Sequence, residues 1–114
     1  MFRDQKQQCA VCQTLLELVG MARLWGPEGP TSEAVTLLGE GKDAMSHGEA
    51  LMLEVAFDVW NGGGHADLGD LLATLDKDNL HAVGELMSAM ALGMHAVDDW
   101  LDSRISGEKR LEET

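Results

Sequence analysis

The segment from Ser46 to Asn61, SHGEALMLEVAFDVWN, constrains the fold more than any other part of the chain. Ser46 and Glu49 have the spacing of a capping box, so we predict a helix over about residues 47–61. Four of its polar side chains fall on one narrow stripe at helical spacing: His47, Glu54, Asp58 and Asn61. Most of the remaining circumference is apolar, and such a helix is normally surrounded by neighbours. We therefore predict that this helix lies at the centre of the protein, packed on two or three sides.

The N-terminal segment also has helical periodicity. Its apolar residues form one wide face: Val11, Cys12, Leu15, Leu16, Leu18, Val19, Ala22 and Trp25. This pattern predicts a helix that begins near Arg3 or Asp4 and ends at about Trp25. The following GPEGP stretch, residues 26–30, excludes helix because proline lacks the amide donor and glycine loosens the backbone.

Capping residues mark three further helical regions. Thr31 or Ser32 can cap a short helix that ends at Gly39 and Gly41. Ala66 or Asp67 starts another short helix, whose expected apolar face is Leu68, Leu71, Leu72 and Leu75. Asp76 or Asp78 can cap the last region. Apolar residues then recur there at heptad spacing: Leu80, Val83, Met87, Met90, Met94, Val97 and Leu101. Whether Gly93 divides this region into two helices stays open, since a mid-helix glycine costs only about 1 kcal/mol.

The fold class that follows is all-α. The chain has 114 residues, 45% of them hydrophobic, which is enough for one core and too short for two ordinary domains. We predict a single helical domain over residues 1–114, a compact bundle of five or six short helices around the central apolar helix at about 47–61. We expect residues 107–114 to form a frayed tail.

Charge is distributed unevenly along the chain. The net charge is -12, and residues 40–102 hold thirteen acidic side chains against only Lys42 and Lys77. A negative field repels nucleic acid and anionic membrane and attracts basic surfaces. The N-terminal residues 1–8 are polar and carry no apolar signal-peptide core, and no stretch approaches the length of a membrane span. We therefore expect a cytoplasmic protein that binds neither nucleic acid nor membrane directly.

Two groups of residues are candidates for metal or redox chemistry. Cys9 and Cys12 form a CxxC, but no strand precedes it and no second ligand pair accompanies it. We interpret both as structural thiols, with a metal or thiol site as the alternative, and we expect no cofactor. The methionines near residue 90 lie on the heptad stripe, where packing explains them better than copper does.

The stretch GGGHAD, residues 62–67, resembles neither a phosphate loop nor a catalytic site. It lacks a following lysine, and no partner motif for His65 and Asp67 occurs on the other helices. We interpret the glycines as a hinge between helices. Asn61 and the first glycine suit the left-handed residue that ends a helix. We find no catalytic signature and expect no enzyme.

These features favour a small acidic protein-protein interaction module. In physical character it is like the inhibitors, immunity proteins and antitoxins that occlude a basic surface of a partner protein. The candidate contact residues are all acidic: Glu54, Asp58, Asp67, Asp70, Asp98, Asp99 and Asp102. Two alternatives remain: a metal- or thiol-responsive protein using Cys9 and Cys12, and a homodimeric structural subunit. The dimer seam would comprise Leu80, Val83, Met87, Met90 and Met94.

Overall fold

The structure is a computed structural model that describes the backbone of residues 2–113 and the side chains of residues 2–104. Over that part of the chain it contains six α-helices, two 3-10 turns and one very short hairpin. In chain order the elements are α1 (Gln5–Glu17), η1 (Ala22–Leu24), β1 (Trp25–Gly26), β2 (Gly29–Pro30), α2 (Ser32–Gly39), η2 (Lys42–Ala44), α3 (His47–Asn61), α4 (Leu68–Thr74), α5 (Lys77–Leu92) and α6 (Met94–Glu113). The predicted all-α class is confirmed. No helix in the described residues is both long and apolar enough to cross a bilayer.

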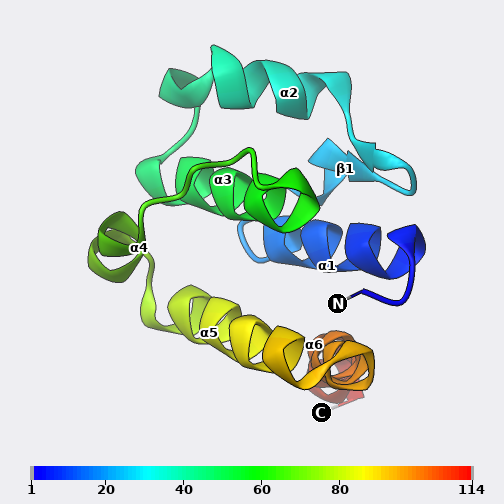
Figure 1. Ribbon diagram of the computed structural model, residues 1–114. Coiled ribbons are helices and arrows are strands. Elements are labelled where there is room, and N and C mark those ends of the chain that lie inside the picture. The colour runs from blue at the N-terminus through cyan, green and yellow to red at the C-terminus, as the bar shows by residue number, and fades with distance from the viewer. Residues whose placement is uncertain (1, 114) are drawn as a thin grey trace.

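The helices form three layers (Figure 1). α1 and α3 lie side by side in the middle, α2 and the hairpin cover one side of this pair, and α5 and α6 cover the other. α4 lies at one end, between α3 and α5 in the chain. This arrangement places α3 between neighbours on two sides, as its nearly continuous apolar circumference predicted.

The two ends of α3 confirm the predicted caps. The Ser46 side chain accepts from the Glu49 amide at 3.1 Å, and the Glu49 carboxylate accepts from the Ser46 amide at 2.8 Å. Gly62 ends the helix in the left-handed conformation, with φ of 76°. Seven consecutive or near-consecutive side chains of α3 are buried: Ala50, Leu51, Met52, Leu53, Val55, Ala56 and Phe57.

The prediction that the first helix continues to Trp25 is wrong, because α1 ends at Glu17. Gly20 adopts a φ of 75°, which L-residues with side chains rarely tolerate. The Met21 amide then donates to the Leu16 carbonyl and the Gly20 amide to the Glu17 carbonyl. These two bonds form a Schellman motif, which satisfies the last carbonyls of the helix. The chain reverses there and forms the antiparallel hairpin in which Trp25 pairs with Pro30.

The region after α3 contains three helices. Asp67 caps α4 and Asp76 caps α5, each accepting from the amide three residues later. Gly93, at φ 114°, divides the last helical region into α5 and α6, which settles the question left open by the sequence. The heptad stripe is therefore not one continuous seam: Val83 is buried inside the protein, whereas Met94 belongs to α6. The prediction of a frayed tail over residues 107–114 falls on residues whose side chains lie outside the described part, and it stays a prediction.

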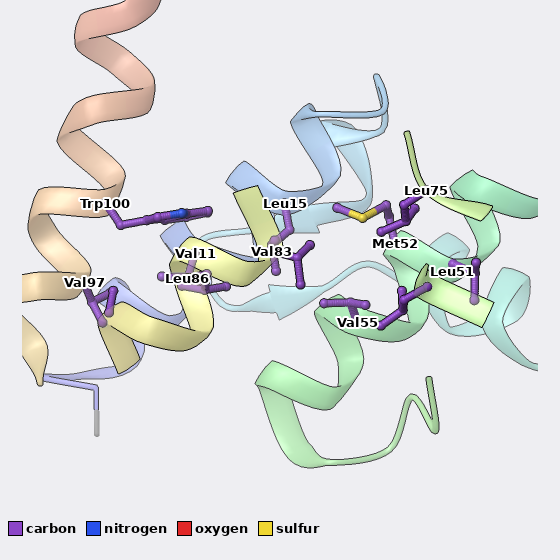
Figure 2. Close-up of a cluster of buried hydrophobic side chains, with 12 residues drawn as sticks. Val11, Leu15, Leu51, Met52, Val55, Leu75, Val83, Leu86, Val97 and Trp100 are labelled. Atoms are coloured by element: carbon purple, nitrogen blue, oxygen red, sulfur yellow. The ribbon is translucent and has the colours of Figure 1, made fainter. Parts of the chain in front are cut away.

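Two apolar cores lie on the two sides of the α1–α3 layer. The α2-side core comprises Cys9, Cys12, Leu16, Met21, Leu24, Trp25, Ala34, Leu53, Ala56 and Phe57. The α5-side core, drawn in Figure 2, comprises Val11, Leu15, Leu51, Met52, Val55, Leu71, Leu75, Val83, Leu86, Ala89, Val97 and Trp100. Burying a leucine or methionine side chain contributes about 1.5–3 kcal/mol relative to leaving it exposed to water, so both cores stabilise the fold.

Candidate functional site

Glu54, predicted as a partner contact, is engaged within the protein. Its carboxylate accepts from the Lys42 ammonium at 2.8 Å, and only 14% of the side chain is exposed. The pair lies on an open cleft of about 350 Å³, which His47 and Asp70 also line. Because Lys42 offsets its charge, Glu54 contributes less to the external field than the sequence suggested.

Asp58 holds the glycine-rich loop that follows α3. Its Oδ1 accepts from the amides of Gly64 at 3.0 Å and His65 at 2.9 Å, and its Oδ2 accepts from the Ala66 amide at 2.9 Å. Charge-assisted bonds to backbone amides are among the stronger hydrogen bonds in proteins. Both carboxylate oxygens therefore bind backbone amides of the loop, and we assign Asp58 a structural role.

Gly64 explains why this loop needs its glycines. A Cβ added there would overlap the carbonyl oxygen of Glu54, so the loop backbone lies directly on α3. His65 is the one residue other than glycine with positive φ in the described backbone, at 56°, which indicates how tightly the turn is held. The hinge interpretation therefore becomes more specific, because the loop is fastened to α3 by Asp58.

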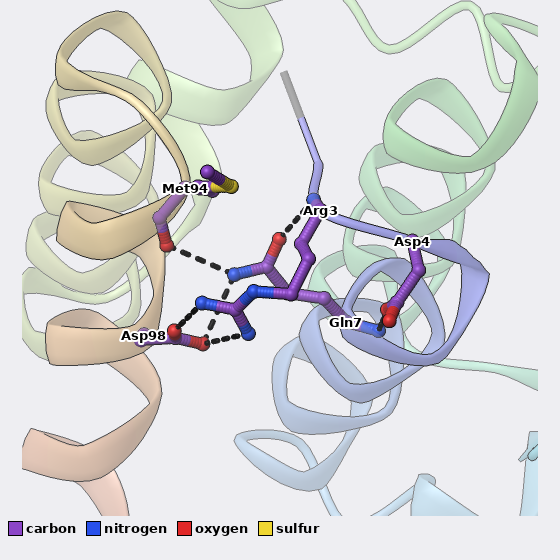
Figure 3. Close-up of polar contacts among 5 residues, drawn as sticks. All are labelled: Arg3, Asp4, Gln7, Met94 and Asp98. Carbon is purple, nitrogen blue, oxygen red and sulfur yellow. Dashed lines mark hydrogen bonds and ion pairs between the residues drawn. The ribbon is translucent and has the colours of Figure 1, made fainter.

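Asp98 belongs to a polar junction between the N-terminus and α6 (Figure 3). The Arg3 guanidinium forms a two-pronged ion pair with its carboxylate, and Gln7 Nε2 donates to it at 3.0 Å. The hydrogen bond from Arg3, aided by the one from Gln7, holds the pKa of the Asp98 carboxyl below its ordinary value.

Gln7 is the one buried polar side chain of the described residues, 5% exposed, and all parts of its amide are used. Its Nε2 also donates to the Met94 carbonyl at 2.9 Å, and its Oε1 accepts from the Arg3 amide at 2.6 Å. The junction thus joins α1 to the first turn of α6. Asp98 is occupied by this structural contact.

The remaining predicted contact residues are exposed but do not share one surface. Asp67 and Asp70 lie at the start of α4, whereas Asp99 and Asp102 lie on α6. Figure 1 places α4 and α6 on opposite sides of the view, with α5 between them. The structure therefore divides the predicted acidic surface into two separate patches.

Cys9 and Cys12 are both free and buried in the α2-side core. Burial raises the pKa of the Cys12 thiol to about 12 and also raises the pKa of Cys9. Cys12 donates to the Ala56 carbonyl at 3.4 Å, as a packed structural thiol does. Within the described residues, no three His, Cys, Asp or Glu side chains come together as a set of metal ligands.

The structure contains an apolar groove between α4 and α5 that the sequence does not predict. It has a volume of about 370 Å³ and is lined by Val55, Asp58, Val59, Ala66, Leu68, Leu71, Val83, Leu86, Met87 and Met90. Leu68 and Met87 on its rim are 61% and 60% exposed. Of the four leucines predicted to form the apolar face of this helix, only Leu71 in α4 and Leu75, the residue that follows α4, are buried. Leucines at positions 68, 71, 72 and 75 have the spacing of a single helical face, so their pattern carries no sign that Leu68 and Leu72 stay exposed.

The described surface therefore offers two kinds of recognition. Exposed carboxylates on α4 and α6 attract cationic groups, and the α4–α5 groove can bury apolar ones. Each is an ordinary component of a protein-binding surface. The chain matches no protein-family model, no curated protein and no solved structure.

Proposed function

We propose that this protein is a small acidic interaction module that docks on a basic surface of a partner protein and carries out no chemistry itself. Docking would act by occlusion, with the negative field guiding the partner into place. Complementary charge of this kind accelerates association and selects partners more than it adds affinity.

The observation that carries the proposal is the amount of negative charge that stays unpaired at the surface. Among residues 2–104, ion pairs involve only four carboxylates: Glu33, Glu54, Glu85 and Asp98. Asp70, Asp99 and Asp102 are exposed and belong to none of these pairs. Unpaired surface carboxylates repel one another, so retaining them is easiest to understand if a cationic partner relieves the repulsion.

The test compares the native chain with a charge-neutralised variant. Asp70→Asn, Asp78→Asn, Asp99→Asn and Asp102→Asn are combined, all at exposed positions where substitution changes stability by about 0.5 kcal/mol or less. The tagged native chain captures its partner from the lysate of its own cells, and the purified partner is then titrated with both forms. We expect the native chain to bind a basic protein at roughly 0.05 M salt and to bind it far more weakly at roughly 0.5 M.

Two results would contradict the proposal. Equal association rates and equal affinities of the native and neutralised chains would remove charge as the determinant of binding. An affinity that is the same at both salt concentrations would do so as well. Thermal unfolding of the neutralised chain serves as the control that its fold is intact.

A further inference from the structure

The α4–α5 groove is an open surface and not an enclosed pocket. Val55 and Val59 of α3 form part of its floor, Leu68 and Leu71 one wall, and Val83, Met87 and Met90 the other. A small ligand is normally buried over most of its surface in a closed pocket. Here the rim residues Leu68 and Met87 are themselves more than half exposed, and the neighbouring Leu72 is 60% exposed. The apolar surface therefore extends beyond the groove, as expected for contact with a macromolecule.

Charge on the surrounding elements selects the kind of macromolecule. The groove lining contains no lysine, arginine or histidine, and Asp58, its only charged member, is hydrogen-bonded to the loop. Residues 46–92, which form all its walls, carry eight acidic side chains and one basic residue, Lys77. Lys42 and Arg104, from outside this range, pair with Glu54 and Glu85, and the other six carboxylates have no ion-pair partner among residues 2–104. A basic partner is attracted to such a site. A second copy of this chain, with its own net charge of -12, is repelled.

The shape of the groove indicates which kind of secondary structure of a partner it can bind. It lies between two helices and over a third, and such a trough receives the apolar face of another helix. Methionine side chains, here Met87 and Met90, adapt readily to the side chains of an incoming helix. The strands of the described residues, Trp25–Gly26 and Gly29–Pro30, pair with each other and do not line the groove, so strand addition has no edge to use there.

We infer that the α4–α5 groove receives an amphipathic helix of the partner protein, with apolar side chains between Leu68 and Met87 and with lysines or arginines along its flanks. This inference rests on the proposed function and names the part of the surface at which docking occurs. The acidic patch on α6 is then a steering surface and not the contact itself.

The experiment uses the full chain and three synthetic peptides of about 15 residues. The first has leucines at i, i+3/i+4 and i+7 and lysine or arginine elsewhere. The second replaces each basic residue of the first with glutamate, and the third is a scrambled form of the first without an apolar stripe. Methyl and amide NMR spectra report the binding site. We expect only the first peptide to shift the Met87 and Met90 methyl signals.

Variants inside and outside the groove test where the peptide binds. Met87→Gln and Leu68→Gln change exposed rim residues, and Leu92→Gln changes a residue on α5 that is 79% exposed and outside the groove lining. We expect each rim variant to weaken binding of the first peptide by about tenfold, because central apolar contacts carry most of the energy of an interface. The Leu92 variant should bind like the native chain.

The contrary outcomes separate the two proposals. The first and third peptides are both basic. If they bind equally and shift the NMR signals of acidic residues but not those of Met87 or Met90, the groove inference is wrong and the proposal of acidic docking still stands. If the acidic peptide binds as well as the first, or if no peptide binds, the groove inference also fails. Methyl shifts of Met87 and Met90 on dilution of the protein alone would identify a second copy as the occupant and overturn it. The proposed function itself fails only in the salt and charge comparison with the native partner.

Discussion

The α2-side core and the α5-side core share the helices α1 and α3 but differ in how completely the chain covers them. On the α2 side, the rings of Trp25, Phe57 and Trp60 meet edge to face, with centroids of Trp25 and Phe57 5.1 Å apart. On the α5 side, leucine, valine and methionine dominate. Among the described residues, five of the six large exposed apolar side chains lie on α4, α5 and α6: Leu68, Leu72, Met87, Leu92 and Met94.

This difference predicts that the two sides of the protein have different roles. Rigid aromatic rings in fixed geometry specify one packing arrangement, whereas flexible methionine and leucine side chains can adapt to the surface of a binding partner. We therefore expect substitutions on the α2 side to change folding and substitutions on the groove rim to change binding. The following predictions test that division, from the largest effect to the smallest.

The first prediction concerns the reactivity of the thiols in the α2-side core. Burial raises the pKa of Cys12 to about 12, from an ordinary value of 9.0, so its thiolate fraction at pH 8 falls by about a thousandfold. Labelling of native Cys12 by a thiol reagent should therefore be at least that much slower than labelling of the urea-unfolded chain. Val35→Cys, at an exposed position on α2, is the control that labels freely. Rapid labelling of native Cys12 would mean that this core is open and would revive the thiol-responsive alternative.

The second prediction compares an aromatic core residue with a rim methionine. Phe57→Ala should lower the free energy of unfolding by about 3–5 kcal/mol, because it leaves a cavity beside Trp25. Met87→Ala, at an exposed side chain, should change it by about 0.5 kcal/mol or less. Urea unfolding measures both. Similar losses in the two variants would show that the groove rim is part of the structural core.

The third prediction tests the close approach of the glycine loop to α3. Gly64→Ala should lower the free energy of unfolding by about 2–3 kcal/mol, since the new methyl group overlaps the Glu54 carbonyl. Gly84→Ala, in the middle of α5 with open space around it, should raise the free energy of unfolding by about 0.5–1 kcal/mol. If both substitutions stabilise the protein, the loop does not lie against α3 as described.

The fourth prediction concerns the carboxylate that holds the same loop. Asp58→Ala should lower the free energy of unfolding by about 2 kcal/mol, because three loop amides lose their charged acceptor. Amide hydrogen exchange of Gly64, His65 and Ala66 should accelerate together. Asp58→Asn keeps one acceptor oxygen and should fall between the native chain and the alanine variant. Unchanged exchange at all three amides would contradict the structural role assigned to Asp58.

The smallest expected effect is at the α1–α6 junction. The pKa of Asp98 is lowered in the folded protein, so the unfolded chain binds more protons as the pH falls. The stability that Asp98 provides is therefore present above pH about 4 and is lost as the pH falls through its folded pKa. The stability difference between the native chain and Asp98→Asn should shrink over that range. A stability difference between the native chain and Asp98→Asn that stays the same across this pH range would contradict the role assigned to Asp98.

Local sequence signals were sufficient for most of the helical framework. The Ser46–Glu49 capping box, the thirteen-against-two charge imbalance and the apolar circumference of α3 are properties of neighbouring residues, so they can be read without knowing the fold. The end of α1 also has a local signal, because Gly20 can act as a left-handed terminator, although the apolar stripe continues beyond it to Trp25.

What only the tertiary structure decided is which charges and leucines stay available. Asp58 and Asp98 resemble Asp70 and Asp102 in the sequence, yet the structure engages both of the first two. Asp58 accepts from amides of the loop that folds back onto α3, and Asp98 accepts from Arg3 and Gln7 near the start of the chain. Leu68 and Leu71 likewise look equivalent, but only one of them meets the core. The physical reason is the same in each case: helical periodicity determines which side chains share a face, and only the packing of other elements determines whether that face is covered.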